Sequence, residues 1–190
     1  PKTQTMPAEG FPMLYYHHGA GGNAEQVFTR GKYLRTAIDI VVPYKVLDRG
    51  NGPSQIAAER GWASSGFAGH MSLDHLGLVL GFGMFGYNVF NPVALYNNYY
   101  QMVWERTYFR RFLNQLELDA GLCPDADTGG ATAFRINPDM QMLMGQSLGN
   151  WTSSLQLAAD PEPFEGVLFT GMAGTWMKLF TNSSTFRTAM

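Results

Sequence analysis

Short apolar runs separated by turn residues divide the chain into strand-like and helix-like segments. The runs at 12–17 and 140–144 are continuous stretches of apolar and aromatic residues, which is typical of strands buried in a parallel sheet. The runs at 62–67 and 166–171 are further strand candidates, and 38–42 predicts a shorter strand. The pattern therefore predicts several short strands distributed along the whole chain.

Helical segments alternate with these strands. Ser54 is placed to cap a helix over 55–60. A longer helix is predicted to start at Asn91-Pro92, and a third, over 151–159, follows closely after the strand at 140–144. Because strands and helices alternate, the sequence predicts an α/β fold with a mainly parallel sheet and flanking helices.

In the long helix, apolar and aromatic residues recur at spacings of three and four, which predicts the face that packs on the sheet. This predicted core face consists of Val93, Tyr96, Tyr100, Val103, Trp104, Phe109, Phe112, Leu113 and Leu116. Polar residues fall largely on the opposite side, namely Arg106, Arg110, Arg111, Gln115 and Glu117. Turn residues at 124–130 end the helical region, and Asn137-Pro138-Asp139 predicts a turn before the strand at 140–144.

Composition narrows the class of protein. A chain of 190 residues with 45% hydrophobic content can bury one sizeable core, so we interpret it as a single domain or most of one. The net charge of −2, without a basic run, offers no electrostatic footprint for nucleic acid. No apolar run has the length of a transmembrane helix. The only cysteine, Cys123, leaves no internal disulfide and no Cys-rich metal site.

The segment Gly145-Gln146-Ser147-Leu148-Gly149 joins a predicted strand directly to a predicted helix. Gly-x-Ser-x-Gly in that context is the pattern of a nucleophile elbow, in which a sharp turn presents the serine hydroxyl above the sheet. Such a turn strains the serine backbone and leaves room only for small residues two positions before and after it. Ser147 is therefore the candidate nucleophile.

A second motif, His18-Gly19-Ala20-Gly21-Gly22, follows the strand at 12–17. A glycine-rich loop can aim backbone N–H groups at the oxyanion of an acyl-transfer intermediate, each donor contributing about 3–4 kcal/mol. Together the two motifs resemble those of the α/β-hydrolase superfamily, of the serine esterase and lipase type. The resemblance implies that Ala20 and Leu148 supply the oxyanion-hole N–H groups, with Gly21 as an alternative, while His18 supports the loop.

The resemblance implies a carboxylic-ester hydrolase that works through an acyl-enzyme on Ser147. It also implies that residues 1–190 form a single incomplete α/β-hydrolase domain, in which 68–91 is a loop or cap-like region over the sheet. The family's chain order is Ser, then Asp or Glu, then His. No histidine follows Ser147, and 167–190 contains no acidic residue. We therefore expect the acid and the histidine to lie beyond residue 190, and the 190-residue chain alone to be inactive or very weak.

Two alternatives stay open. A non-catalytic binding module of the same fold would carry the motifs without an acid and a base. A hydrolase-fold acyltransferase or amidase would use the same serine with a different acceptor or substrate, because fold and elbow do not determine either.

No cofactor and no metal are expected. His70, Asp74 and His75 lie close in sequence, but two histidines five residues apart on a loop are weak ligand spacing. The acidic stretch 125–130 lacks the later Glu of a Ca²⁺ loop and is interpreted as a solvated turn. The expected partner is a small-molecule ester, with no nucleic acid and no transmembrane segment, and the sequence leaves the oligomeric state open.

Overall fold

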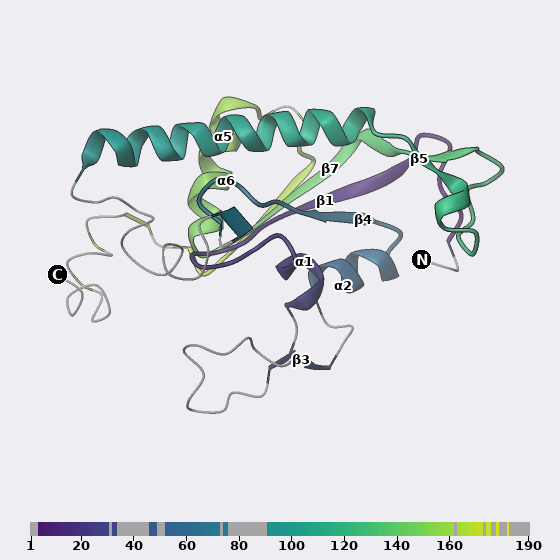
Figure 1. The fold of residues 1–190 in the computed structure, drawn as a ribbon, viewed down its shortest axis with the longest axis horizontal. Coiled ribbons are helices and arrows are strands. Elements are labelled where there is room, and N and C mark those ends of the chain that lie inside the picture. Colours follow the sequence, from purple (N-terminus) through teal and green to yellow (C-terminus); the bar gives the residue numbers. More distant parts are fainter. Residues whose placement is uncertain are drawn as a thin grey trace.

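The structure, a computed structural model, describes residues 4–30, 32–33, 46–48, 52–72, 74–75, 91–161, 163–172, 174–175, 178 and 182. At its centre is a four-stranded sheet in the order β4-β1-β7-β8 (Figure 1). The strands are β1 Phe11–His17, β4 Ala63–Gly66, β7 Ile136–Gln146 and β8 Gly166–Thr170. All neighbouring pairs in this sheet run parallel, which confirms the predicted parallel arrangement.

Helices flank the sheet, as predicted. Figure 1 shows it between α5 Pro92–Gln115 with α6 Leu148–Ala159 on one side and α1 Gln26–Thr29 with α2 Pro53–Glu59 on the other. The smaller elements are β2 Lys32–Tyr33, β3 Val46–Asp48, β5 Leu118–Asp119, η1 Ala120–Leu122 and β6 Ala133–Phe134. Within the described residues, no helix combines the length and the apolar character needed to span a membrane.

The apolar core lies between the sheet and α5. Its buried centre is formed by Met13 and Tyr15 of β1, Leu143 of β7 and Leu113 of α5. Alternate residues of β1 and β7 thus face α5, as the period of two along a strand requires. Because β1 and β7 run parallel, their carboxyl ends lie at the same edge of the sheet.

Three predictions need correction or fall outside the described residues. Gly52 is the N-cap residue of α2 and Pro53 its first residue, so Ser54 lies inside the helix and does not cap it. Proline suits the first helical position because its φ is already helical and its missing N–H has no partner to lose. The strand predicted at 38–42 and most of the 68–91 segment, namely 73 and 76–90, lie outside the described residues.

The turn predicted at Asn137-Pro138-Asp139 does not end an element, because β7 runs through it. Asn137 still makes the side-chain hydrogen bond that is typical of a turn, because its Oδ1 accepts from the Asp139 N–H at 2.9 Å. The pairing with β1 shifts register over this stretch, between Phe11 and Met13. The prediction of a separate turn was therefore wrong: these residues form an irregularity within a long strand, where a proline is tolerated.

The predicted core face of α5 is confirmed only in part: Val103 and Leu113 are buried, and Phe109 and Leu116 pack against the core. The buried residues of this helix are Tyr99, Met102, Val103, Arg106, Thr107, Arg110 and Leu113. Most of the aromatic stripe is exposed instead, including Val93, Tyr96, Tyr100, Trp104 and Phe112. Apolar residues occur on more than one side of α5, so the helical period alone does not decide which side packs inward. Hydrogen-bond acceptors in α6 and directly after it decide which side of α5 is buried.

Two arginines on the buried face of α5 make those contacts. Arg106 Nη1 donates to Thr152 Oγ1 of α6, and its guanidinium lies 5.7 Å from the centroid of the Phe67 ring. Burial lowers the pKa of Arg106 to about 9. Arg110 differs in that its Nη2 donates to a carboxylate, Asp160 Oδ2, at 2.8 Å. Of these two buried cations, only Arg110 forms an ion pair in the described part of the chain.

This difference predicts opposite effects of the same substitution. Arg106→Met is expected to leave the free energy of unfolding unchanged or to raise it by about 1 kcal/mol, because methionine fills the space without a buried, unpaired charge. Arg110→Met is expected to lower it by about 1–2 kcal/mol, because Asp160 then loses its partner. Urea unfolding followed by circular dichroism measures both. A larger loss in Arg106→Met than in Arg110→Met would contradict this account.

Candidate active site

Ser147 lies between the last residue of β7 and the first residue of α6. Its backbone angles are φ 53° and ψ −118°, and no other non-glycine residue of the described chain has a positive φ. Such a conformation costs an L-residue about 1–3 kcal/mol. Hydrogen bonds maintain it: the Ser147 N–H donates to the Thr170 carbonyl at 2.9 Å, and the Ser147 carbonyl accepts from the Asn150 N–H at 3.0 Å. The strained serine is exposed at the carboxyl edge of the sheet.

The glycines on either side of Ser147 occupy space that is closed to any side chain. A Cβ atom at Gly145 would lie 2.7 Å from Asn150 Oδ1 and 2.9 Å from Asn150 Cα. A Cβ atom at Gly149 would overlap the His17 carbonyl oxygen and lie 2.7 Å from the His18 carbonyl oxygen. The turn can therefore bring α6 down onto the ends of β7 and β1 only with glycine at both positions.

The loop 18–22 lies directly against this elbow, because β1 and β7 are neighbouring strands. A Cβ atom at Gly19 would lie 2.5 Å from Gln146 Oε1 and 3.0 Å from the Cβ of Ser147. The Gly22 N–H donates to the Gly19 carbonyl at 3.1 Å and closes the loop into a tight turn. The tertiary structure thus brings together the two motifs that the sequence separates by more than a hundred residues.

The other motif residues occupy distinct places. His18 turns toward its own loop, with Nδ1 2.8 Å from the Gly19 carbonyl oxygen, and burial lowers the pKa of its imidazole. Ala20 is exposed, and Gly21 has a φ of 66°. Leu148 begins α6, so its N–H has no partner within the helix. The N–H groups of Ala20 and Leu148 remain the candidate oxyanion donors.

Polar side chains outside both motifs tie the elbow to its surroundings. Arg30 Nη1 donates to Gln146 Oε1 at 3.1 Å and to Gln26 Oε1 at 3.3 Å, which connects the elbow to α1. Asn150 Nδ2 donates to the Thr170 carbonyl at 2.7 Å, and Asn150 Oδ1 accepts from the Thr170 N–H at 3.2 Å. No sequence signal indicated Arg30 or Thr170, because each acts across elements that are distant in sequence.

His17 anchors α6 to the end of β1. Its Nδ1 lies 2.7 Å from Ser153 Oγ, and that hydroxyl donates to the Gly149 carbonyl at 2.6 Å. Because the hydroxyl proton is already used, His17 Nδ1 carries the proton in their shared hydrogen bond. Burial, together with the nearby Arg106, lowers the pKa of His17 well below its usual value. His17 is therefore a neutral, structural imidazole.

This depressed pKa makes stability depend on pH. Below about pH 6.5 the unfolded chain takes up a proton at His17 that the folded chain does not, so the free energy of unfolding is expected to fall with decreasing pH. The contribution of one such group is at most about 1.4 kcal/mol per pH unit. Urea unfolding between about pH 7.5 and pH 5 measures it. His17→Asn, which keeps a donor for Ser153, should reduce the slope; the wild-type slope in that variant would contradict the assignment.

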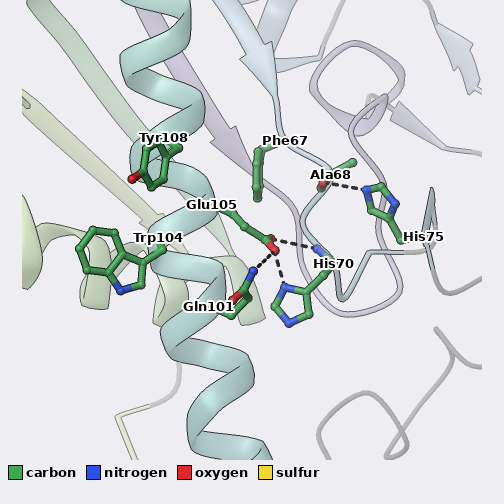
Figure 2. A pocket seen from close by; sticks show the side chains of 8 residues that line it. All are labelled: Phe67, Ala68, His70, His75, Gln101, Trp104, Glu105 and Tyr108. Carbon is green, nitrogen blue, oxygen red and sulfur yellow. Dashed lines mark hydrogen bonds and ion pairs between the residues drawn. The ribbon is translucent and has the colours of Figure 1, made fainter.

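None of the four histidines of the chain is hydrogen-bonded to Ser147 among the described residues. His17 and His18 are used at the end of β1. His70 Nδ1 lies 3.1 Å from Glu105 Oε2, and His75 Nε2 lies 3.1 Å from the Ala68 carbonyl oxygen (Figure 2). Each imidazole therefore has a local partner other than the candidate nucleophile.

His70, Asp74 and His75 do not converge on a common point. The Asp74 carboxylate accepts from the Ala24 N–H at 3.0 Å, whereas the two imidazoles contact Glu105 and the Ala68 carbonyl. Across the described ranges, no three histidine, cysteine, aspartate or glutamate side chains are grouped as metal ligands. His70 and Asp74 instead hold the segment after β4 against α5 and the loop after β1, and His75 closes this segment on itself.

An apolar cavity of about 470 Å³ lies beside α6. Its walls come from the start of α5, from α6 and from the segment after β8, and its largest apolar side chains are Leu95, Tyr96, Tyr99, Trp151, Leu155 and Met172. Trp151, the lining residue nearest to Ser147 in sequence, lies four positions after it, and Ser147 itself does not line the cavity. Its size is that of a small-molecule site.

Comparisons with protein-family models, with curated proteins and with solved structures find no match to this chain. The functional interpretation therefore depends on the geometry around Ser147.

Proposed function

We propose that the protein is a serine hydrolase of the α/β-hydrolase type that acts on carboxylic esters through an acyl-enzyme on Ser147. The observation that carries the proposal is the strained backbone of Ser147, at φ 53°, with the Gly19 loop packed against it. Strain of this kind persists only where the surrounding structure enforces it, and it concentrates at functional sites. An ordinary turn between a strand and a helix does not need it.

The position of Ser147 suits nucleophilic attack. Its Oγ would attack the ester carbonyl carbon while a base takes the hydroxyl proton, and the oxyanion would accept hydrogen bonds from the N–H groups of Ala20 and Leu148. The alcohol then leaves with that proton as the C–O bond breaks. Water, deprotonated by the same base, attacks the acyl-enzyme and releases the acid and free Ser147. The apolar cavity beside α6 offers room for the acyl or alcohol group.

The proposal requires a base and an acid that the described residues do not supply. The four histidines have other partners, and none of them follows Ser147 in the sequence. We therefore propose that an acidic residue and a histidine beyond residue 190 complete the triad in the full-length protein. Ser147 without them would keep its geometry and lose nearly all of its reactivity.

Two other functions use the same geometry. A non-catalytic module would retain the fold and the cavity and bind its ligand without turnover. An acyltransferase or amidase would form the same covalent intermediate and differ in the acceptor or the bond cleaved. Product analysis with water, alcohol and amine acceptors distinguishes the latter from an esterase.

A fluorophosphonate probe tests the proposal on the full-length protein. Covalent labelling is expected in the wild type and absent in Ser147→Ala. Ser54→Ala is the matched control, because Ser54 lies inside α2 and belongs neither to the elbow nor to the lining of the cavity beside α6. This control variant should be labelled normally. A folded full-length protein that takes up no label would exclude the enzyme and favour the binding module.

A further inference from the structure

A second cavity, of about 700 Å³, lies on the outer side of α5, where the segment after β4 packs against the helix (Figure 2). Its volume is within the range of small-molecule sites. The segment after β4 provides four lining residues, and α5 provides the other four: Phe67, Ala68, His70, His75, Gln101, Trp104, Glu105 and Tyr108. The cavity combines exposed aromatic rings with a carboxylate, a combination that the motif analysis did not indicate.

Glu105 is the polar centre of this cavity. Its carboxylate accepts three hydrogen bonds: from Gln101 Nε2 at 2.8 Å, from the His70 N–H at 3.1 Å and from His70 Nδ1 at 3.1 Å. Burial alone would raise the pKa of Glu105, but these hydrogen bonds outweigh it and lower the pKa. The carboxylate is therefore ionised at neutral pH. A carboxylate has about four acceptor positions, so about one is left free.

The polar groups around Glu105 present acceptors to a ligand. Because the carboxylate can only accept, His70 Nδ1 carries the proton, which leaves Nε2 as an acceptor. This Nε2 is buried and has no hydrogen-bond partner in the described part of the chain, so it is closed to a ligand as the structure stands. Gln101 uses its amide nitrogen on Glu105, so its carbonyl oxygen is free to accept. His75 donates its Nε2–H to the Ala68 carbonyl oxygen, which leaves its Nδ1 as an acceptor. The complementary ligand is rich in donors.

Aromatic rings extend the cavity away from these acceptors. Figure 2 shows Trp104 and Tyr108 on one side of Glu105 and His70 on the other. The two rings are 49% and 67% exposed, and their centroids lie 6.4 Å apart. Exposed rings of this kind provide apolar surface for the body of a ligand whose polar end lies elsewhere.

We propose that this cavity binds a primary alkylammonium ion. Its N–H groups would donate to the free position of the Glu105 carboxylate and to the carbonyl oxygen of Gln101, and its alkyl chain would cover Trp104 and Tyr108. An ammonium group can donate to both acceptors at once and neutralises the carboxylate, whereas an alcohol has one donor and no charge. The site lies on α5 outside the Ser147 elbow, so it is independent of ester hydrolysis.

A titration with n-butylammonium chloride at constant ionic strength, followed by ¹H–¹⁵N chemical shifts of residues 101–108, tests this proposal. A saturating shift with a Kd of about 1–10 mM is expected, and n-butanol should bind at least about tenfold more weakly. Equal binding of butanol, or no saturation up to about 100 mM butylammonium, would overturn the proposal. A neutral polyol that binds better than the ammonium ion would also overturn it, in favour of a site for hydroxyl groups.

Amino-acid substitutions test whether butylammonium binds in this cavity. Glu105→Gln keeps the shape and an acceptor for His70 and should weaken butylammonium binding about tenfold. Glu117→Gln removes the same charge at an exposed position beyond the end of α5 and should leave binding unchanged. Trp104→Leu should weaken binding about threefold, and it gives an independent test if Glu105→Gln loses its fold by circular dichroism. Wild-type affinity in a folded Glu105→Gln protein would reject the site.

Discussion

Ser147→Ala is expected to lower the turnover of a short-chain ester by the full-length protein about a thousandfold or more. The nucleophile, base and acid of such a unit act together, so loss of the nucleophile alone removes nearly the whole effect of the triad. What remains would come from the oxyanion donors and from substrate binding. Because alanine lacks only the hydroxyl oxygen, the backbone at φ 53° should keep its hydrogen bonds to Thr170 and Asn150.

The measurement is kcat/KM for a p-nitrophenyl ester, with Ser54→Ala as the control. The control should stay within about twofold of the wild type, because Ser54 lies in α2, outside the elbow and the cavity beside α6. Unchanged turnover in Ser147→Ala would show that the hydrolysis has another origin. An equal fall in the two variants would point to a general loss of folded enzyme in place of loss of a nucleophile.

Gly149→Ala is expected to lower the free energy of unfolding by about 2–4 kcal/mol. Alanine is the better helix former by about 1 kcal/mol, so propensity alone predicts a gain in stability. The tertiary structure reverses the sign. The new Cβ would overlap the His17 carbonyl oxygen and lie 2.7 Å from the His18 carbonyl oxygen, and both are backbone atoms that cannot rotate away. Relief of this overlap requires α6 to move off β1.

Gly174→Ala is the matched control for this substitution. A Cβ atom at Gly174 would have nothing within 4 Å, so the free energy of unfolding should change by less than about 0.5 kcal/mol. Thermal unfolding should show a decrease of about 5–15 °C for Gly149→Ala and almost none for the control. A stabilised Gly149→Ala protein would mean that α6 sits farther from β1 than the structure indicates.

The sequence by itself determined the order of the strands and helices along the chain and the location of the elbow. The apolar runs at 12–17 and 166–171 correspond to β1 and β8 nearly at their predicted bounds. For β1 the reason is burial, because a strand inside a parallel sheet needs apolar residues on both faces. The motif around Ser147 was recognisable because its requirement is local: a strand, a sharp turn that only glycine can flank, and a helix. A local requirement of that kind restricts which residue types can stand next to one another, so it can be recognised in the sequence.

Only the tertiary structure decided which surfaces meet. The packing face of α5 was predicted only in part because its apolar residues surround much of the helix. Thr152 and Asp160 offer partners to Arg106 and Arg110, so these two arginines lie on the buried face. The bond from Arg30 to Gln146 likewise joins residues far apart in sequence. The same holds for the pair of His70 and Glu105. A hydrogen bond between residues far apart in sequence depends on where the fold places both of them. The sequence around either residue alone therefore does not predict it.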